Sequence, residues 1–194
     1  MSREFPILDT KRLRLRELAK GDAEAIFAIH ADVEGMRWFG SDPMKELSEA
    51  EQLIDIFADW RKLPNPGVRW GIERLDDGNI IGTCGLFKWN RAWRVCTIGY
   101  ELAQHARNQG FMQEALASAI TWGMQEMALN RVEAQIYPEN VPSIKLAEKL
   151  GFRFEGILRQ LGHWQEQFHD LGGYALLRND WHKQRNVDSG EVRP

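Results

Sequence analysis

Hydrophobic and polar positions change their period along the chain. Residues 12–18 alternate, with leucines set against arginines, and this period of two predicts a strand with one solvated face. After Gly21 the apolar residues recur at helical spacing. They do so again after Ser48, which stands three residues before Glu51 in the spacing of a capping box. The pattern predicts two amphipathic helices, the second with an inner face of Leu53, Ile56, Phe57 and Trp60.

The middle of the chain is rich in β-forming residues. Segments 68–74, 80–89 and 95–102 are separated by short turn-forming stretches, which predicts three consecutive antiparallel strands. The remaining pattern predicts a helix, a strand, a second helix and a closing pair of strands, at 110–127, 131–137, 142–150, 152–161 and 168–177. The order is β-α-α-β-β-β-α-β-α-β-β, which gives seven strands and four helices.

This order predicts a single α/β (α+β) domain with a mixed, mostly antiparallel sheet over residues 1–183. A chain of 194 residues with 43% hydrophobic and 27% charged residues has the length and composition of one globular domain. Residues 184–194 are polar and show no apolar period, so we expect a flexible tail there.

Charge and cysteine content exclude several classes of function. A net charge of −3 argues against a general electrostatic grip on nucleic acid or acidic membranes. No apolar run approaches the ~20 residues of a membrane span, and the first ten residues lack the order of a signal peptide, so we expect a cytoplasmic protein. Cys84 and Cys96 are too few and too far apart for a zinc site. We expect both to be reduced core thiols, and we expect no metal.

A first candidate site lies where the strand at 95–102 leads through a short loop into the helix at 110–127. Arg107 and Gly110 occupy the point where free backbone N–H groups and the helix dipole create an anion site. Gly110 would let a phosphate oxygen approach the main chain closely. Ordinary capping and turn geometry would explain the same two residues.

A second candidate segment, 137–152, follows the next strand. Asn140 suits a helix N-cap, and Pro142 and Ser143 suit a first turn, so capping alone would also explain them. Both segments follow strands joined by a right-handed β-α-β crossover, which brings their loops to one crevice.

These two segments together resemble the Gcn5-related N-acetyltransferases, over roughly residues 10–180. The stretch Arg107-Asn108-Gln109-Gly110-Phe111-Met112 is similar to the Q/R-x-x-G-x-G/A pyrophosphate loop of that family, with Met112 departing at the last small position. Asn140-x-x-Ser143 and Leu150-Gly151-Phe152 resemble its second signature. The branch that acetylates the N-terminal alanine of ribosomal proteins (RimJ/RimL-type) is the most similar.

The resemblance implies an acetyl-CoA site between two splayed strands, the fourth and fifth of the predicted seven. It implies that the cofactor-binding residues are Tyr100, Leu102, Arg107, Asn108, Gln109, Gly110, Phe111, Met112, Asn140 and Ser143. Backbone N–H groups of the strand at 98–102 would hold the pantetheine arm and polarise the thioester carbonyl.

The resemblance leaves the catalytic residues less defined. Many relatives carry Glu where this chain has Thr97, so we take Glu101 as the candidate base, acting through water. The alternative for Glu101 is a solvated carboxylate at the strand end or a salt bridge to a nearby arginine. Ser143 or Tyr137 is the candidate proton donor to the departing sulfur. Strand alternation places Thr97 and Glu101 on one face and Tyr100 on the other.

Amine chemistry bears on the acceptor. An α-amine titrates near 7.7 to 8.0 and a lysine amine near 10.4, so an α-amine needs a weaker base. The resemblance implies acetyl-CoA as a partner, and the amine chemistry favours a protein N-terminus, such as that of a ribosomal protein, as the acceptor. We expect no direct nucleic-acid or membrane binding. A small amine as acceptor and an acyl-CoA-binding regulatory module remain alternatives, and both a monomer and a homodimer stay open.

Eight tryptophans are available for the core or for acceptor binding. Trp38, Trp60 and Trp122 fit helix faces and are expected in the core. The tryptophans expected to be able to line an acceptor groove are Trp89, Trp93 and Trp164.

Overall fold

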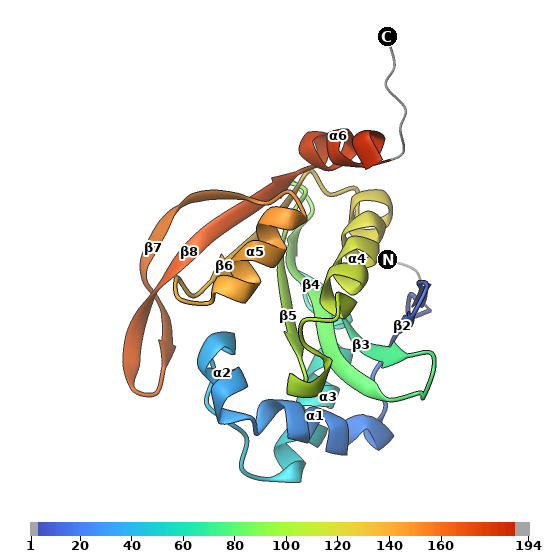
Figure 1. Cartoon of the computed structure of the whole chain (residues 1–194), viewed down its shortest axis with the longest axis vertical. Helices are drawn as coiled ribbons and strands as arrows, with labels where there is room; N and C mark the ends of the chain where they lie inside the picture. The colour runs from blue at the N-terminus through green and yellow to red at the C-terminus, as the bar shows by residue number, and fades with distance from the viewer. Residues whose placement is uncertain (1–3, 189–194) are drawn as a thin grey trace.

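The computed structural model describes residues 4–188 and shows one mixed sheet of eight strands with helices packed on both faces (Figure 1). The strands are β1 Leu8–Asp9, β2 Leu13–Arg16, β3 Val68–Arg74, β4 Ile80–Asn90, β5 Val95–Leu102, β6 Arg131–Ile136, β7 Arg153–Trp164 and β8 Gln167–Leu177. The α-helices are α1 Ala23–His30, α2 Val33–Phe39, α3 Leu47–Asp59, α4 Phe111–Glu126, α5 Val141–Lys149 and α6 Arg178–Asp188. The fold class is the one expected from the sequence.

The strand order is β1-β2-β3-β4-β5-β6-β8-β7, and every neighbouring pair is antiparallel except β5 and β6. That parallel pair is short: it joins residues 95–97 to residues 131–133 and goes no further. Beyond Thr97, β5 continues along β4 while β6 continues along β8, so the sheet opens between them. The predicted splay of these two strands is confirmed.

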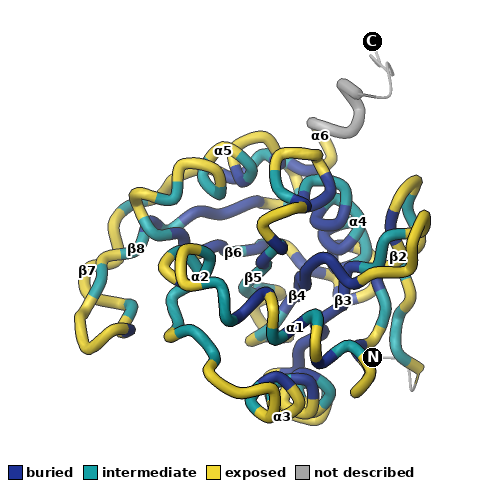
Figure 2. The backbone as a smooth tube through the Cα atoms, turned by 60° about the horizontal axis from the view of Figure 1, so that its bottom comes forward, coloured by how far each residue is buried: buried dark blue, intermediate teal, exposed yellow. Residues whose placement is uncertain are grey.

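Successive side chains of β3 point to opposite faces of the sheet. Trp70 belongs to the large core cluster and packs edge to face on Trp122 of α4, with ring centroids 5.3 Å apart. Arg69, the preceding residue, points to the opposite face, where its guanidinium lies 5.1 Å from the ring of Phe57 in α3. Figure 2 shows the resulting pattern, with burial concentrated along the central strands and exposure along β7.

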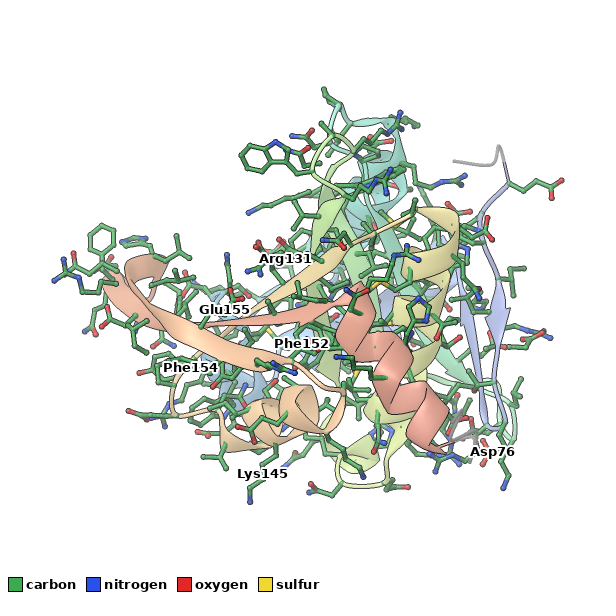
Figure 3. All side chains as sticks on the ribbon, turned by 90° about the horizontal axis from the view of Figure 1, so that it is seen from above. Asp76, Arg131, Lys145, Phe152, Phe154 and Glu155 are labelled. Atoms are coloured by element: carbon green, nitrogen blue, oxygen red, sulfur yellow. The ribbon has the colours of Figure 1, made fainter. Side chains whose placement is uncertain are left out.

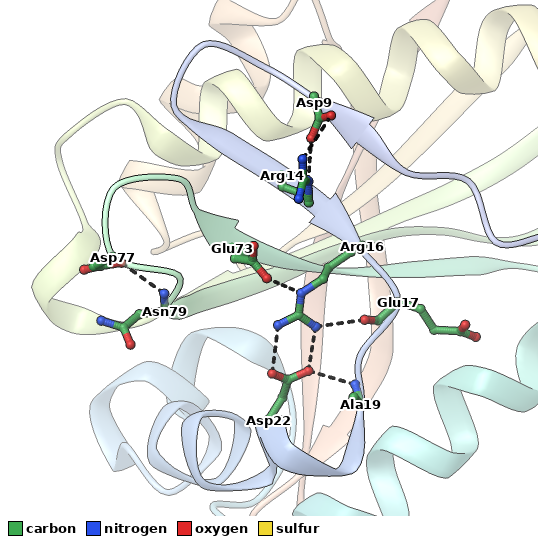
Figure 4. A network of polar contacts seen from close by, with 9 residues as sticks. All are labelled: Asp9, Arg14, Arg16, Glu17, Ala19, Asp22, Glu73, Asp77 and Asn79. Atoms are coloured by element: carbon green, nitrogen blue, oxygen red, sulfur yellow. Dashed lines mark hydrogen bonds and ion pairs between the residues drawn. The ribbon is translucent and has the colours of Figure 1, made fainter.

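Polar contacts fix the start of α1 against the sheet (Figure 4). The guanidinium of Arg16 in β2 donates to both carboxylate oxygens of Asp22, at 2.8 and 3.0 Å, and also pairs with Glu73 in β3. Asp22 accepts a further hydrogen bond from the backbone N–H of Ala19, at 2.7 Å. Arg16 of β2 and the backbone of Ala19 therefore hold Asp22, the N-cap of α1, and Glu73 of β3 holds Arg16 in turn.

The last two strands form a long ribbon at the end of the sheet. Arg131 of β6 reaches over β8 to the carboxylate of Glu155 in β7, with Nη1 and Oε1 2.9 Å apart (Figure 3). Phe152 is buried just before β7, whereas Phe154 within the strand is 54% exposed (Figure 3). The ribbon is held to the sheet at its base and leaves an apolar side chain in solvent.

Several expected elements need correction. The single helix expected after Gly21 is in fact two helices, α1 and α2. The backbone adopts an extended conformation at Asp32, which separates them. The second predicted helix starts earlier, with its capping box formed by Glu46 and Glu49. Ile56 is 52% exposed, because a period of 3.6 residues places a different set on the buried face of α3: Ala50, Ile54 and Phe57.

The C-terminal segment is also more ordered than its polarity suggested. Helix α6 includes residues 183–188, and the boundary expected at residue 183 therefore falls inside a helix. Trp181 is 6% exposed and belongs to the main core cluster, and Arg178 donates to the carbonyl of Leu129 at 2.7 Å, so the start of this polar helix is anchored to the core. The last six residues of the expected tail, 189–194, lie outside the described residues.

Candidate active site

A cleft of about 1030 Å³ lies where β5 and β6 part. Its wall includes Thr97, Gly99 and Glu101 from one face of β5 as well as Tyr100 and Leu102 from the other. Alternation had suggested that only one of these sets would face the site. Both do, because the cleft passes through the opening in the sheet and meets β5 on both faces.

The loop between β5 and α4 forms one end of this cleft. Asn108 and Gly110 have positive φ angles of 61° and 77°, and Gly110 is the N-cap of α4 without a side-chain cap. The N–H groups of the first helical turn have no acceptors within the helix, so this turn presents free donors to an anion. Gly110 adopts this backbone conformation without the strain that a Cβ would bring.

The loop is held from outside by Arg12. Its Nη1 donates to the carbonyl of Gln109 at 3.0 Å, and its Nε donates to Glu114 in α4 at 2.7 Å. The side chain of Gln109 turns back to the carbonyl of His105, at 2.8 Å. Gln109 is the one predicted site residue that is not in the cleft wall.

Arg107 connects the loop to α2. Its Nε donates to the carbonyl of Leu102 at 3.1 Å, and its Nη2 pairs with Asp32 at 2.9 Å. The side chain therefore braces the end of β5, while the main chain of the loop supplies the donors that face the cleft.

The second predicted segment meets β5 through a pair of hydroxyl groups. Asn140 caps α5, since its Oδ1 accepts from the backbone N–H of Ser143 at 3.2 Å. The Ser143 hydroxyl donates to the hydroxyl oxygen of Tyr100 at 3.0 Å. Burial raises the pKa of Tyr100, although the hydrogen bond from Ser143 acts in the opposite direction. Tyr100 therefore remains protonated at neutral pH and has a proton to donate.

A buried polar cluster lies on the other side of β5. The carboxylate of Glu101 pairs with Arg69 of β3 and accepts from the hydroxyl of Thr83 in β4. Nε2 of His30, at the end of α1, lies 3.4 Å from Glu101 Oε1. Burial alone would raise the pKa of Glu101, but the charge of Arg69 and the contacts with His30 and Thr83 outweigh it and lower the pKa. The salt bridge considered for Glu101 is present.

Aromatic side chains close the far end of the cleft. Trp164 stacks on His169 with ring centroids 3.7 Å apart, and Tyr137 packs edge to face on both rings. At the tip of the β7–β8 hairpin, the backbone N–H of Gln165 donates to Asp42 at 3.1 Å. The hairpin thus reaches the segment between α2 and α3 and encloses this end of the cleft.

Sequence reasoning placed some aromatic residues correctly and others wrongly. Trp164 lines the cleft and Trp122 packs in the core, as expected, but Trp89 and Trp93 are outside the cleft wall. Trp38, expected in the core, is half-buried and lines the cleft instead. Trp60 packs against the smaller core cluster, as expected, and also lines the cleft. The side chains face the opening because their helices border it rather than cover the closed part of the sheet.

His30 and Arg69 were not singled out from the sequence. Both are at least 97% buried and both line the cleft. The available signal was a positive charge at position 69 among the apolar residues 68–72, since such charges are rarely buried without a partner.

The two cysteines offer no nucleophile. Both are free and buried, and burial raises the pKa of Cys84 to about 12 and also raises that of Cys96. Within residues 4–188 no three His, Cys, Asp or Glu side chains are grouped to hold a metal ion. The same range contains no helix with the length and apolar character needed to cross a bilayer.

An opened sheet, a loop whose helical turn has free backbone donors, and a protonated hydroxyl pair at the opening together suit an acyl-CoA-dependent transferase site. Comparison with known families agrees: the acetyltransferase (GNAT) domain model matches residues 12–153. The chain belongs to the GNAT acetyltransferase family and is an N-acetyltransferase that uses acetyl-CoA.

Two curated relatives from Bacillus subtilis match nearly the whole chain. The uncharacterized N-acetyltransferase YoaA is 37% identical over 175 residues, which cover 90% of this chain and 98% of that protein. The protein named "Putative ribosomal N-acetyltransferase YdaF" is 30% identical over 181 residues, covering 90% of this chain and 96% of that protein.

Solved structures share the fold. RimJ of Mycobacterium smegmatis, in complex with CoA-disulfide, superposes with a TM-score of 0.79 at 23% identity, covering 92% of this chain and 89% of that one. Spermidine N-acetyltransferase of Vibrio cholerae, in complex with CoA and spermine, gives 0.76 at 21% identity, covering 89% and 99%.

Proposed function

We propose that this enzyme acetylates the N-terminal α-amine of a protein, with a ribosomal protein as the class of acceptor. The observation that carries this proposal is the state of Glu101. This carboxylate is the candidate base, yet it is paired with Arg69 and its pKa is lowered. A weak base suits an amine that is already partly neutral at pH 7, as an α-amine is and a lysine or polyamine nitrogen is not.

The names of relatives support the same class of acceptor. YdaF carries a ribosomal designation, and RimJ is a structural neighbour. Spermidine N-acetyltransferase is also a neighbour, which keeps a small polyamine as the second candidate. A polycation needs free carboxylates, but those in the cleft wall already have partners: Asp42 accepts from Gln165, Glu49 caps α3, and Glu101 pairs with Arg69.

The residues have assigned roles in this proposal. The loop 107–112 holds the pyrophosphate through its main chain, and the free edge of β5 together with Asn140 holds the pantetheine arm. The amine attacks the thioester carbonyl and its proton leaves toward Glu101 through water. Ser143 and Tyr100 protonate the departing thiolate, with Tyr137 as an alternative donor.

The test is acetyl transfer from labelled acetyl-CoA to peptides with free Ala, Ser or Met N-termini, followed by mass spectrometry. Matched peptides with a blocked N-terminus and one internal lysine, and spermidine, serve as competing acceptors. We expect label on the free α-amine only. Label confined to lysine or spermidine would overturn the acceptor class, and binding of acetyl-CoA without any transfer would favour a regulatory module.

A further inference from the structure

We propose that His30 is the residue that receives the proton from the acceptor amine, and that Glu101 orients it and stabilises its charged form. The inference deepens the proposed function, on which it rests. It replaces a carboxylate acting through water by a histidine–carboxylate pair within the same cleft.

The burial and contacts of His30 carry the proposal. The side chain is 3% exposed, lies at the last position of α1, and forms part of the cleft wall. Its Nε2 is buried without a hydrogen bond in the described structure, and Oε1 of Glu101 lies 3.4 Å away. A buried imidazole nitrogen that faces a carboxylate without forming a good hydrogen bond calls for an explanation, and a role in catalysis is one that fits.

Glu101 is poorly placed to take the proton itself. One of its oxygens pairs with Arg69, and the other faces both the Thr83 hydroxyl and His30. Protonation of Glu101 would remove the negative charge that the buried guanidinium requires. Protonation of His30 instead creates a positive charge beside the carboxylate, and the carboxylate can accept a hydrogen bond from it.

The elements around the pair hold it in place. Phe39 of α2 packs edge to face on the His30 ring, with centroids 5.4 Å apart and planes at 86°. The charged and polar groups that face the pair are Arg69 from β3 and Thr83 from β4. The opposite end of α1 is fixed by the Arg16–Asp22 contacts (Figure 4), so the helix presents His30 at a defined position.

The step balances with residues already described. The amine nitrogen forms a bond to the thioester carbonyl carbon, and its N–H proton passes to a ring nitrogen of His30. The C–S bond then breaks, and the thiolate takes a proton from Tyr100, which Ser143 supports. Solvent returns the proton from His30 to the hydroxyl pair, so the enzyme leaves the cycle unchanged.

The test compares His30→Gln, which keeps a polar side chain but cannot act as a base at neutral pH, with the wild type. The control is His163→Gln, at an exposed position of β7 outside the cleft wall. We expect His30→Gln to lower kcat about 100-fold with KM for acetyl-CoA unchanged, within the range of general-base loss. The acid limb of the kcat–pH profile should disappear, and His163→Gln should behave as wild type.

A second variant separates catalysis from packing. His30→Ala leaves a hole on the cleft wall, and added imidazole should restore its kcat at least tenfold, which a purely structural role would not allow. Circular dichroism and acetyl-CoA titration confirm that each variant is folded and binds. Any of three results overturns the proposal. These are a wild-type kcat in His30→Gln, an acid limb retained in the kcat–pH profile of that variant, and a folded His30→Ala variant that imidazole does not rescue. The assays use whichever amine the wild type accepts, so a wrong acceptor class does not affect the outcome.

Discussion

Single residues in this cleft work through fixed partners. The Tyr100 hydroxyl receives a hydrogen bond from Ser143 and so keeps its own proton available, and Glu101 keeps its charge because Arg69 lies against it. The second pair is deeply buried: Arg69 is 3% exposed and Glu101 8%. Removing one member of such a pair leaves an uncompensated charge in the interior, which costs far more than the pair itself contributes.

The Arg69–Glu101 pair therefore makes a prediction about stability. Arg69→Met should lower the free energy of unfolding by about 3 to 5 kcal/mol, because Glu101 is left buried without its cation. The double variant Arg69→Met/Glu101→Gln should recover much of this loss. Urea unfolding of the wild type, both single variants and the double variant measures the coupling. Additive effects would contradict the importance of the pair.

The same pair predicts a pH dependence. The pKa of Glu101 in the folded protein is lower than its ordinary value, so its stabilising contribution is complete above the unfolded value of about 4.3. That contribution is lost only as the pH falls through the lower, folded pKa. The difference in unfolding free energy between wild type and Glu101→Gln should not fall between about pH 8 and 6, and it should shrink below about pH 4. A difference that shrinks between pH 8 and 6 would contradict the sign.

Elements differ in how far the sequence specifies them. The glycine turn before α4 and the α5 cap could be predicted because their chemistry is local: Gly110 and Asn140 serve the backbone within a few residues. The His30–Glu101–Arg69 cluster could not, because α1, β5 and β3 meet only in the folded sheet. Helix α6 escaped prediction because the buried Trp181 and the polar contacts of Arg178, rather than a periodic apolar face, anchor its start.

The loop before α4 offers a matched pair of glycine variants. Gly110→Ala places a Cβ at a φ of +77°, and Gly78→Ala does the same at +74° in an exposed turn outside the cleft wall with open space around it. Each should cost about 1 to 2 kcal/mol of stability through backbone strain. Only Gly110→Ala should weaken acetyl-CoA binding, by about tenfold or more, in calorimetric titration. Equal affinities in the two variants would show that the loop does not bind the cofactor.

At the scale of the whole molecule, the sheet consists of two parts joined by a short seam. Strands β1 to β5 form one part and β6, β8 and β7 the other, and only the pairing of residues 95–97 with 131–133 connects them by strand contacts. The cleft occupies the rest of the boundary. A ligand that binds there contacts both parts of the fold, and its binding free energy adds to the stability of the whole.

Acetyl-CoA should therefore raise the melting temperature of the protein. At a ligand concentration of 100 times Kd the gain is about 2.7 kcal/mol, which corresponds to about 5 to 10 °C for a chain of this size. Differential scanning calorimetry with and without millimolar acetyl-CoA measures the shift. Gly110→Ala should show a smaller shift at the same concentration. An unchanged melting temperature in the wild type would contradict the cofactor site.

The short seam between β5 and β6 also has a consequence for turnover. Past Thr97, the backbone amides of β5 that point away from β4 have no strand to meet, so in the empty enzyme they should exchange hydrogen with solvent quickly. A bound pantetheine arm would protect them, in effect as a temporary extra strand. The spent coenzyme must break that ladder to depart, so every catalytic cycle includes this step in addition to bond making.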